Sequence, residues 1–277
     1  MILVTGATGN VGRQVVHQLL AAGHPVRAMT RNPATARLPE PVQVIKGDLG
    51  SIDQCLEGVE SVFLMWPFHT ADAAPAVVQA IARHATRVVL LSSGAVRDQP
   101  DSAVGRSHHE LERRVEQSGL AWTMLWPSTF AANSLWWADQ IRAGNTVRGA
   151  FGALPMAMLH EHDIAAVAVR ALTSAGHEGA RHTLTGPQAL TQIEQVRILG
   201  EALGRPLRWQ ELTREEERRR LLADDGFPDS FVDALLDGYA QLLDSPPPVV
   251  TRTVEEITAS PARTFAQWAA DHAADFG

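Results

Sequence analysis

The fold of this chain is decided at its start, by the stretch MILVTGATGNVGRQVV (residues 1–16). Three apolar residues, 2–4, are followed by three glycines, Gly6, Gly9 and Gly12. Apolar residues then recur at the three- and four-residue spacing of a helix that faces a core. The stretch therefore predicts a strand, a tight glycine turn and a helix, in that order.

Glycines at this spacing favour the binding of a diphosphate. The turn brings bare backbone and the free N–H groups of a helix start to one place, where the helix dipole also favours negative charge. If the turn were only structural, each glycine would cost roughly 1 kcal/mol of conformational entropy without return. We therefore expect a dinucleotide to be bound by residues of the turn and the helix start, namely Gly6, Thr8, Gly9, Asn10, Val11 and Gly12.

The alternation of strand and helix continues to about residue 127. Apolar runs predict further strands at residues 26–30, 42–45, 59–65, 87–91 and 121–125. Helical spacing at 73–84 and 108–117, and a capping pair of Ser51 and Gln54, predict helices between them. Buried parallel strands have this apolar character, so the pattern predicts an α/β fold in which residues 1–127 form a doubly wound parallel sheet of the Rossmann type.

Residues 128–277 follow a looser pattern and predict a smaller, mostly helical C-terminal cap that returns to the sheet in places. A helix is expected at residues 161–174. Two further helices are expected to begin at capping boxes, one formed by Thr191 with Glu194 and one by Thr213 with Glu216. Three prolines at 246–248 interrupt the chain before a last helix, which is expected to start at residue 260.

Composition narrows the class of protein. A net charge of −7 argues against a nucleic-acid-binding surface, which needs clustered Lys and Arg. Cys55 is the only cysteine, so an intramolecular disulfide is excluded and a reducing compartment is favoured. The sequence enters a strand at once, which leaves no room for a signal peptide, and no apolar run approaches the ~20 residues of a membrane helix. We expect a cytoplasmic monomer or homodimer that acts on a small molecule.

The residues after the second predicted strand bear on the choice of cofactor. NAD-binding domains usually carry an acid there, which accepts the ribose hydroxyls. This chain instead has MTRNP (residues 29–33), with a cation and no carboxylate. Arg31 would pair with a 2′-phosphate, so NADP(H) is favoured over NAD(H). If Arg31 only faces solvent, either cofactor would bind.

Several motifs resemble those of one known family. The string VTGATGNVG (residues 4–12), with RNP at 31–33 and GDL at 47–49, resembles the NmrA-like group of atypical short-chain dehydrogenase/reductases. The later segments TMLWP at 123–127 and HEHDIA at 160–165 are similar to motifs of the same group. The likeness spans nearly the whole chain and is greatest for the branch of triphenylmethane reductase and NAD(P)H:quinone oxidoreductase.

The resemblance implies cofactor contacts at the ends of the third, fourth and fifth strands. The residues concerned are Asp48 and Leu49 beside the adenine, Trp66 and Pro67 along the cofactor, and Ser92 or Ser93 near the nicotinamide. The family usually has Arg before the proline of strand six and Gly after it. This chain has Trp126 and Ser128 at those places.

The residues that ordinary short-chain dehydrogenases use for proton transfer are missing. Those enzymes use a Tyr with a Lys four residues later, but the only lysine here is Lys46 and the only tyrosine is Tyr239. On the helix after the fifth strand stand His108 and Glu112, one turn apart, in a His-x-x-x-Glu pattern that resembles the quinone oxidoreductase branch. We expect His108 to hold or protonate a substrate oxygen, and Glu112 to orient its ring or raise its pKa.

Ser93 is the third catalytic candidate, from its expected place near the nicotinamide. The alternative for the histidine and glutamate is a surface ion pair without chemistry. A metal site is not expected, because the spacing of the available ligands matches no metal motif. The ligands considered are His108, His109, Glu112, His160 and His162.

Aromatic residues follow the fourth and sixth strands, at the edge where α/β folds open their clefts. Phe68, Trp126, Phe130 and Trp136 are the candidates for stacking on a flat substrate, unless they are core or dimer contacts. The expected function is hydride transfer from NADPH to a quinone-like or conjugated aromatic molecule without the Tyr/Lys dyad. Two alternatives stay open: a non-catalytic NADP(H)-sensing regulator of NmrA type, and a redox-neutral isomerase or cyclase.

Overall fold

The computed structural model describes residues 1–223 and 229–277, and the chain forms two compact units. The first unit comprises Met1–Pro127, Glu161–Leu184 and Thr253–Pro261. The second comprises Ser128–His160, Thr185–Arg252 and Ala262–Gly277. The chain therefore leaves the first unit after Pro127 and returns to it twice.

A seven-stranded sheet in the order β3-β2-β1-β4-β5-β6-β9 forms the centre of the first unit. Its strands, in chain order, are β1 (Ile2–Val4), β2 (Val26–Thr30), β3 (Gln43–Lys46), β4 (Ser61–Met65), β5 (Arg87–Leu91), β6 (Ala121–Pro127) and β9 (Ala180–Leu184). All neighbouring strands are parallel. The strand order runs outward in both directions from β1, so the switch point of the sheet, where doubly wound folds bind ligands, lies between β1 and β4.

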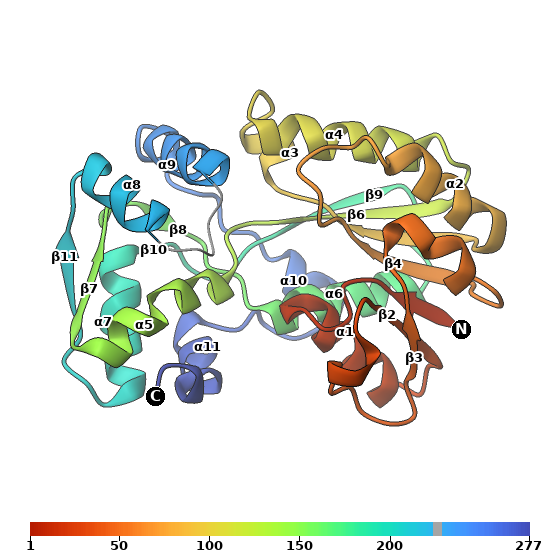
Figure 1. The fold of residues 1–277 in the computed structure, drawn as a ribbon, viewed down its shortest axis with the longest axis horizontal. Coiled ribbons are helices and arrows are strands. Elements are labelled where there is room, and N and C mark those ends of the chain that lie inside the picture. The colour runs from red at the N-terminus through yellow and green to blue at the C-terminus, as the bar shows by residue number, and fades with distance from the viewer. Residues whose placement is uncertain (224–228) are drawn as a thin grey trace. The chain divides into compact units, whose positions relative to one another are not determined.

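Helices cover both faces of this sheet (Figure 1). On one face lie α1 (Asn10–Ala21), α6 (Glu161–Thr173) and α10 (Thr253–Thr258). On the other lie α2 (Ala74–His84), α3 (Ala95–Asp98) and α4 (Ala103–Glu116). Two 3-10 segments, η1 (Pro33–Thr35) and η2 (Leu49–Cys55), flank β3. Because both faces are covered, central strands such as β1 and β4 are apolar and buried at nearly every position.

The predicted doubly wound parallel sheet is confirmed. The strands predicted at 26–30 and 87–91 have those bounds, whereas β6 continues beyond residue 125 to Pro127. The seventh strand, β9, has no counterpart among the predicted strands. Its sequence ARHTL contains no continuous apolar run, because it lies at the edge of the sheet and is mostly only half-buried.

Two helix starts in the first unit differ from the prediction. The helix expected at 108–117 begins at Ala103, where the Ser102 side chain accepts a hydrogen bond from the backbone N–H of Gly105. The short helix after β3 is capped by Asp48 and not by Ser51: the Asp48 carboxylate accepts from the Ser51 N–H at 3.0 Å. Asp and Ser are both good caps, so composition alone does not decide between them.

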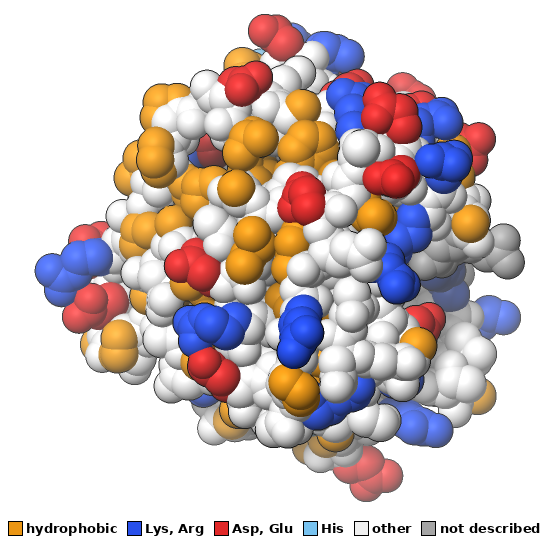
Figure 2. All heavy atoms as spheres, turned by 90° about the vertical axis from the view of Figure 1, so that its left-hand side faces the viewer, with side chains coloured by type: hydrophobic (Ala, Val, Ile, Leu, Met, Phe, Trp, Pro, Cys, Tyr) orange, Lys and Arg blue, Asp and Glu red, His pale blue; other side chains and the backbone are white. Residues whose placement is uncertain are grey.

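The described residues of the second unit are mostly helical and include two small sheets. Its helical segments are η3 (Ala131–Trp137), α5 (Ala138–Ala143), α7 (Gln192–Leu203), α8 (Arg214–Leu222), α9 (Asp229–Leu243), α11 (Phe265–Asp271) and η4 (Ala273–Asp275). Strand β7 (Thr146–Gly149) pairs in parallel with β11 (Arg208–Glu211), and β8 (Pro155–Met156) pairs antiparallel with β10 (Leu190–Thr191). On the face that carries β7 and β11, apolar side chains gather among scattered charged ones (Figure 2).

Local signals in the sequence placed two of the helix starts in this unit. The capping boxes at Thr191 and Thr213 are formed as predicted. The last α-helix starts at Phe265, behind a cap formed by Thr264, and not at residue 260. This helix buries Trp268, whose ring stacks on Phe265 with centroids 5.4 Å apart. In the described part of the chain, no helix is both long enough and apolar enough to cross a bilayer.

A histidine pair at the edge strand makes the stability of the first unit depend on pH. The Nδ1 atom of His177 and the Nε2 atom of His182 lie 3.2 Å apart, so the two nitrogens share one proton in a hydrogen bond. Burial lowers the pKa of both imidazoles, against a smaller opposing effect of Glu178 on His177. Protonation therefore favours the unfolded chain, and the stabilisation is lost as the pH falls below the unfolded-state pKa of about 6.5.

We expect the midpoint of thermal unfolding to fall between about pH 7.5 and about pH 5.5, and to fall less in the His182→Gln variant. The amide of the variant side chain can still bond to His177 but cannot take up a proton. Calorimetric scans of both proteins across this range measure the difference. Equal decreases of the unfolding temperature in the two proteins would show that the histidine pair does not contribute to the pH dependence of stability.

Candidate active site

The glycine turn is held in place by the strand beside it. The Thr5 hydroxyl donates to the carbonyl of Phe63 at 3.1 Å and accepts from the N–H of Met65 at 2.8 Å, which ties the end of β1 to β4. Gly6 follows with φ +60°, a left-handed conformation that favours glycine. Helix α1 then starts behind Gly9, which has no side chain to cap it. The first N–H groups of α1 are therefore available to a ligand.

The two later glycines are needed for different reasons. A Cβ atom on Gly12 would lie 2.1 Å from the carbonyl oxygen of Gly6, so the helix could not pack against the turn. A Cβ atom on Gly9 would lie 3.4 Å from the same oxygen, which is tolerable within the protein itself. Gly12 is therefore required by the packing of the helix, whereas no contact within the protein requires a glycine at position 9. A cradle of this kind fits a diphosphate, which needs bare backbone.

The residues expected around the adenosine lie at the ends of β2 and β3. Arg31 is exposed directly after β2, and Lys46 is exposed at the end of β3. The Asp48 carboxylate accepts from both the N–H and the hydroxyl of Ser51 at 3.0 Å, so it caps η2. Leu49 is buried in the core.

Aromatic side chains follow β4. Trp66 is buried, and its indole N–H donates to the carbonyl of Thr70 at 2.9 Å. Its ring meets that of Phe68 edge-on, with centroids 5.2 Å apart. Phe68 is 45% exposed, and Pro67 between them is exposed as well. This segment offers one free aromatic face, that of Phe68.

The ends of β5 and β6 meet at a buried carboxylate on α4. Glu112 is 2% exposed, and its Oε1 atom accepts hydrogen bonds from the Ser92 hydroxyl and from the Trp126 indole N–H, the latter at 2.7 Å. Its Oε2 atom lies 3.6 Å from Nε of Arg181 on β9. The Arg181 guanidinium also lies 5.9 Å from the centroid of the Trp126 ring. One carboxylate thus contacts the residue after β5, a residue of β6 and a residue of β9.

His108 lies one turn before Glu112 on α4 but does not share this network. Its Nδ1 atom is buried and has no hydrogen-bond partner among the described residues. Burial lowers the pKa of the imidazole. The expectation that Glu112 raises the pKa of this ring is therefore wrong, and Glu112 does not hold the ring by a direct hydrogen bond, because its carboxylate is engaged by Ser92 and Trp126. A neutral imidazole donates one hydrogen bond from one nitrogen and accepts one at the other.

Arg181 is the residue that sequence reasoning missed. Its role depends on β9, which the sequence did not predict as a strand, so no local signal could place it beside Glu112. Ser93, the third catalytic candidate, is half-buried, and its hydroxyl accepts from the N–H of Ala95 at 3.2 Å at the start of α3.

Two of the substrate candidates belong to the second unit. Phe130 precedes η3 and is bridged to Leu159. Trp136 lies in η3 with its ring edge-on to Phe231 at 6.2 Å. The lone tyrosine, Tyr239, lies in α9, where burial raises its pKa to about 12.

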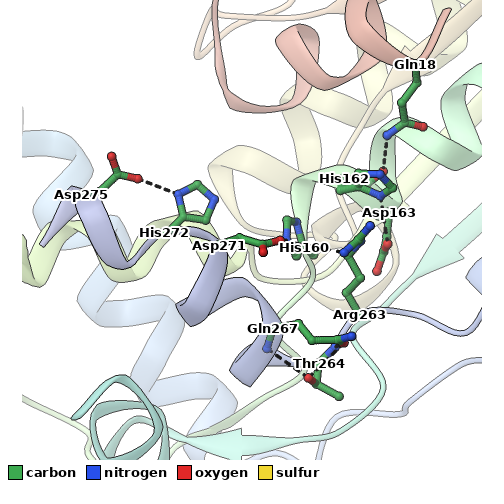
Figure 3. A network of polar contacts seen from close by, with 10 residues as sticks. All are labelled: Gln18, His160, His162, Asp163, Arg263, Thr264, Gln267, Asp271, His272 and Asp275. Carbon is green, nitrogen blue, oxygen red and sulfur yellow. Dashed lines mark hydrogen bonds and ion pairs between the residues drawn. The ribbon is translucent and has the colours of Figure 1, made fainter. Parts of the chain in front are cut away.

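Histidines near the start of α6 have structural neighbours (Figure 3). His160 lies 3.3 Å from the carboxylate of Asp271 on α11. The backbone carbonyl of His162 accepts from Gln18 on α1 at 3.0 Å. Within residues 1–223 and 229–277, no three His, Cys, Asp or Glu side chains are grouped so that they could hold a metal ion.

The sheet is parallel and doubly wound, and the helix after the first glycine turn begins with uncapped N–H groups. These two features define an α/β nucleotide-binding protein. The sequence model of a family described as NAD(P)H-binding matches residues 6–175, and the chain belongs to this family. The earlier resemblance to short-chain dehydrogenase/reductases of the quinone oxidoreductase branch is confirmed. The chain is an NAD(P)H-dependent oxidoreductase.

Named relatives cover the whole chain. The (4-alkanoyl-5-oxo-2,5-dihydrofuran-3-yl)methyl phosphate reductase of Streptomyces griseus is 41% identical over 283 residues, which are 100% of this chain and 99% of the relative. The NAD(P)H azoreductase of Xenophilus azovorans is 37% identical, with 100% and 99% covered. Among solved structures, the NADPH-dependent quinone oxidoreductase of Escherichia coli in complex with NADPH has a TM-score of 0.83 at 25% identity, over 98% of this chain and 99% of that one.

Two glycine substitutions separate folding from cofactor binding. In Gly9→Ala we expect the unfolding temperature to stay within a degree or two, because the new methyl group meets protein only at 3.4 Å. The affinity for NADPH should fall at least tenfold, because the methyl group would stand where we expect the diphosphate to approach. In Gly12→Ala, overpacking against Gly6 should cost about 1–3 kcal/mol of stability.

Thermal unfolding and calorimetric titration with NADPH measure both effects. Full NADPH affinity in a folded Gly9→Ala variant would contradict the assignment of this turn to the diphosphate.

Proposed function

We propose that this oxidoreductase reduces a conjugated, quinone-like small molecule with NADPH, and that it does so without a Tyr/Lys dyad. The observation that carries the proposal is the buried Nδ1 atom of His108 on α4, which has no hydrogen-bond partner among the described residues. Burial also lowers the pKa of this side chain. NADPH would supply the hydride. The protein's own residues would bind it, position the acceptor and hydrogen-bond the oxygen or nitrogen that becomes electron-rich.

The proposed cofactor contacts follow the edge of the sheet at which β1 to β5 end. The N–H groups of the glycine turn would hold the diphosphate, and Asp48 would contact the adenine. Trp66 and Pro67 would line the cofactor, and Ser92 or Ser93 would lie near the nicotinamide. Arg31 would pair with the 2′-phosphate, which supports NADP(H) over NAD(H). The Escherichia coli quinone oxidoreductase to which the chain is similar was crystallised with NADPH.

The absence of a dyad bears on the acceptor. Tyr239 lies in α9 with its pKa at about 12, and Lys46 lies at the end of the edge-side strand β3. A simple ketone becomes a localised alkoxide on hydride addition and needs an efficient acid. A conjugated acceptor spreads the negative charge over several atoms, so a neutral hydrogen-bond donor is sufficient.

His108 would be that donor. An imidazole kept neutral by burial can still donate its N–H to a developing anion, as a weak but well-placed electrophile. The names of the relatives agree with such acceptors: a quinone, an azo compound and an acyl dihydrofuranone can all delocalise the added charge. Phe68 and Trp126 of the first unit are the aromatic residues proposed to contact the flat substrate.

Replacing Arg31 tests the cofactor preference. In Arg31→Ala we expect the KM for NADPH to rise about tenfold to a hundredfold, which corresponds to the loss of one or two charge-assisted hydrogen bonds. The KM for NADH should change less than twofold, since NADH has no 2′-phosphate. Steady-state kinetics with both cofactors measure the ratio. Equal changes for the two cofactors would refute the pairing.

Replacing His108 tests the proposed chemistry. Absorbance at 340 nm follows NADPH oxidation with a panel of quinones, an azo dye and a conjugated lactone. In His108→Ala we expect kcat with the best acceptor to fall about tenfold to a hundredfold, because a hydrogen bond to the developing anion is lost. His109→Ala is the matched control, because this neighbouring side chain is exposed. NADPH binding without turnover of any acceptor would overturn the proposal in favour of a sensor.

A further inference from the structure

We infer that Glu112 is a positioning residue, which fixes helix α4 against the ends of β5 and β6 and thereby determines where His108 lies. It takes no proton from the substrate. The inference deepens the proposed function and rests on it, because it concerns the placement of the proposed hydrogen-bond donor.

The first support is the convergence of donors on one carboxylate oxygen. Ser92 is the first residue after β5, and Trp126 is the last residue but one of β6. Both donate to Oε1 of Glu112. The backbone also joins these strand ends, because the N–H of Ser92 donates to the carbonyl of Leu125 at 3.0 Å. Glu112 therefore binds a rigid platform formed by two adjacent strands.

The second support is that the other oxygen is engaged as well. Oε2 lies 3.6 Å from the Arg181 guanidinium, which also forms an ion pair with Glu116 one turn further along α4. The same guanidinium lies 5.0 Å from the centroid of the Trp122 ring. The carboxylate is 2% exposed and surrounded by donors, so it is not placed to exchange protons with a ligand.

The third support is the geometry of the helix. His108 and Glu112 are four residues apart, so they lie on one face of α4, about 6 Å apart along its axis. The side chains of Leu111 and Val115 on α4 are also buried. Apolar contacts are not directional, however, and allow small rotations of the helix. The hydrogen bonds of Glu112 are directional. They are therefore the contacts that fix the rotation of α4 close to His108.

The consequence for the reaction is large. A side-chain tip lies about 5–6 Å from the helix axis, so a rotation of roughly 10° moves it by about 1 Å. A displacement of this size at a reacting group can cost about a hundredfold in rate. The Nδ1 atom of His108 has no hydrogen-bond partner among the described residues, so its position depends on the helix that carries it.

Glu112→Gln is the direct test, because it keeps the shape but replaces one accepting oxygen with a donor. We expect kcat to fall about tenfold, with the Kd for NADPH changed less than twofold. The double variant His108→Ala/Glu112→Gln should be no slower than His108→Ala alone, because Glu112 acts through His108. Glu110→Gln is the matched control: Glu110 lies on the same helix and pairs with Arg114 at 2.7 Å on the surface. It should leave kcat unchanged.

A measurement without cofactor or substrate separates this inference from the proposed function. Nitrogen NMR of the His108 imidazole should show shifted resonances in Glu112→Gln and in the milder Trp126→Phe, and unchanged ones in Glu110→Gln. Should Glu112→Gln not fold, Trp126→Phe carries the test.

The outcomes are distinct. Unshifted His108 resonances, or additive losses in the double variant, would overturn the positioning role. Unchanged turnover in His108→Ala, together with shifted resonances in Glu112→Gln, would instead refute the proposed function and leave the placement by Glu112 intact.

Discussion

The structure depends on the close approach of helix α1 to the turn that precedes it. At Gly12 the helix backbone lies so near the carbonyl of Gly6 that no side chain fits between them. This approach directs the open helix start toward the end of β1, beside the switch point of the sheet. Packing at Gly12 therefore fixes the place of the helix start, and the uncapped N–H groups behind Gly9 make it suited to an anion.

Local patterns were sufficient to predict most of the first unit. The glycine turn and the apolar strands each depend on residues within a few positions of one another, and the structure has them close to where the sequence indicated. Asp48 shows the limit of such signals, since Asp48 and Ser51 are both suitable caps and the structure has Asp48 as the cap. The edge strand β9 was missed because a half-exposed strand needs no apolar run.

The candidate site was predictable in its residues but not in its contacts. His108 and Glu112 could be placed on one helix face from their spacing. Their expected pairing is absent because Ser92, directly after β5, and Trp126, near the end of β6, bind the carboxylate. Hydrogen bonds between residues far apart in sequence produce no periodic pattern, so the sequence does not show which donors bind the carboxylate. The lowered pKa of His108 follows from the same long-range packing, because burial is its cause.

The return of residues 161–184 and 253–261 to the first unit limits how this protein can be divided. Strand β9 pairs along β6, and α6 covers the face that α1 also occupies. A fragment truncated after Pro127 would leave an open, hydrogen-bonding edge along β6 and an uncovered apolar sheet face, which invite aggregation. The nucleotide-binding half is thus not a transplantable module: genetic fusion or domain exchange has to carry the later segments with it.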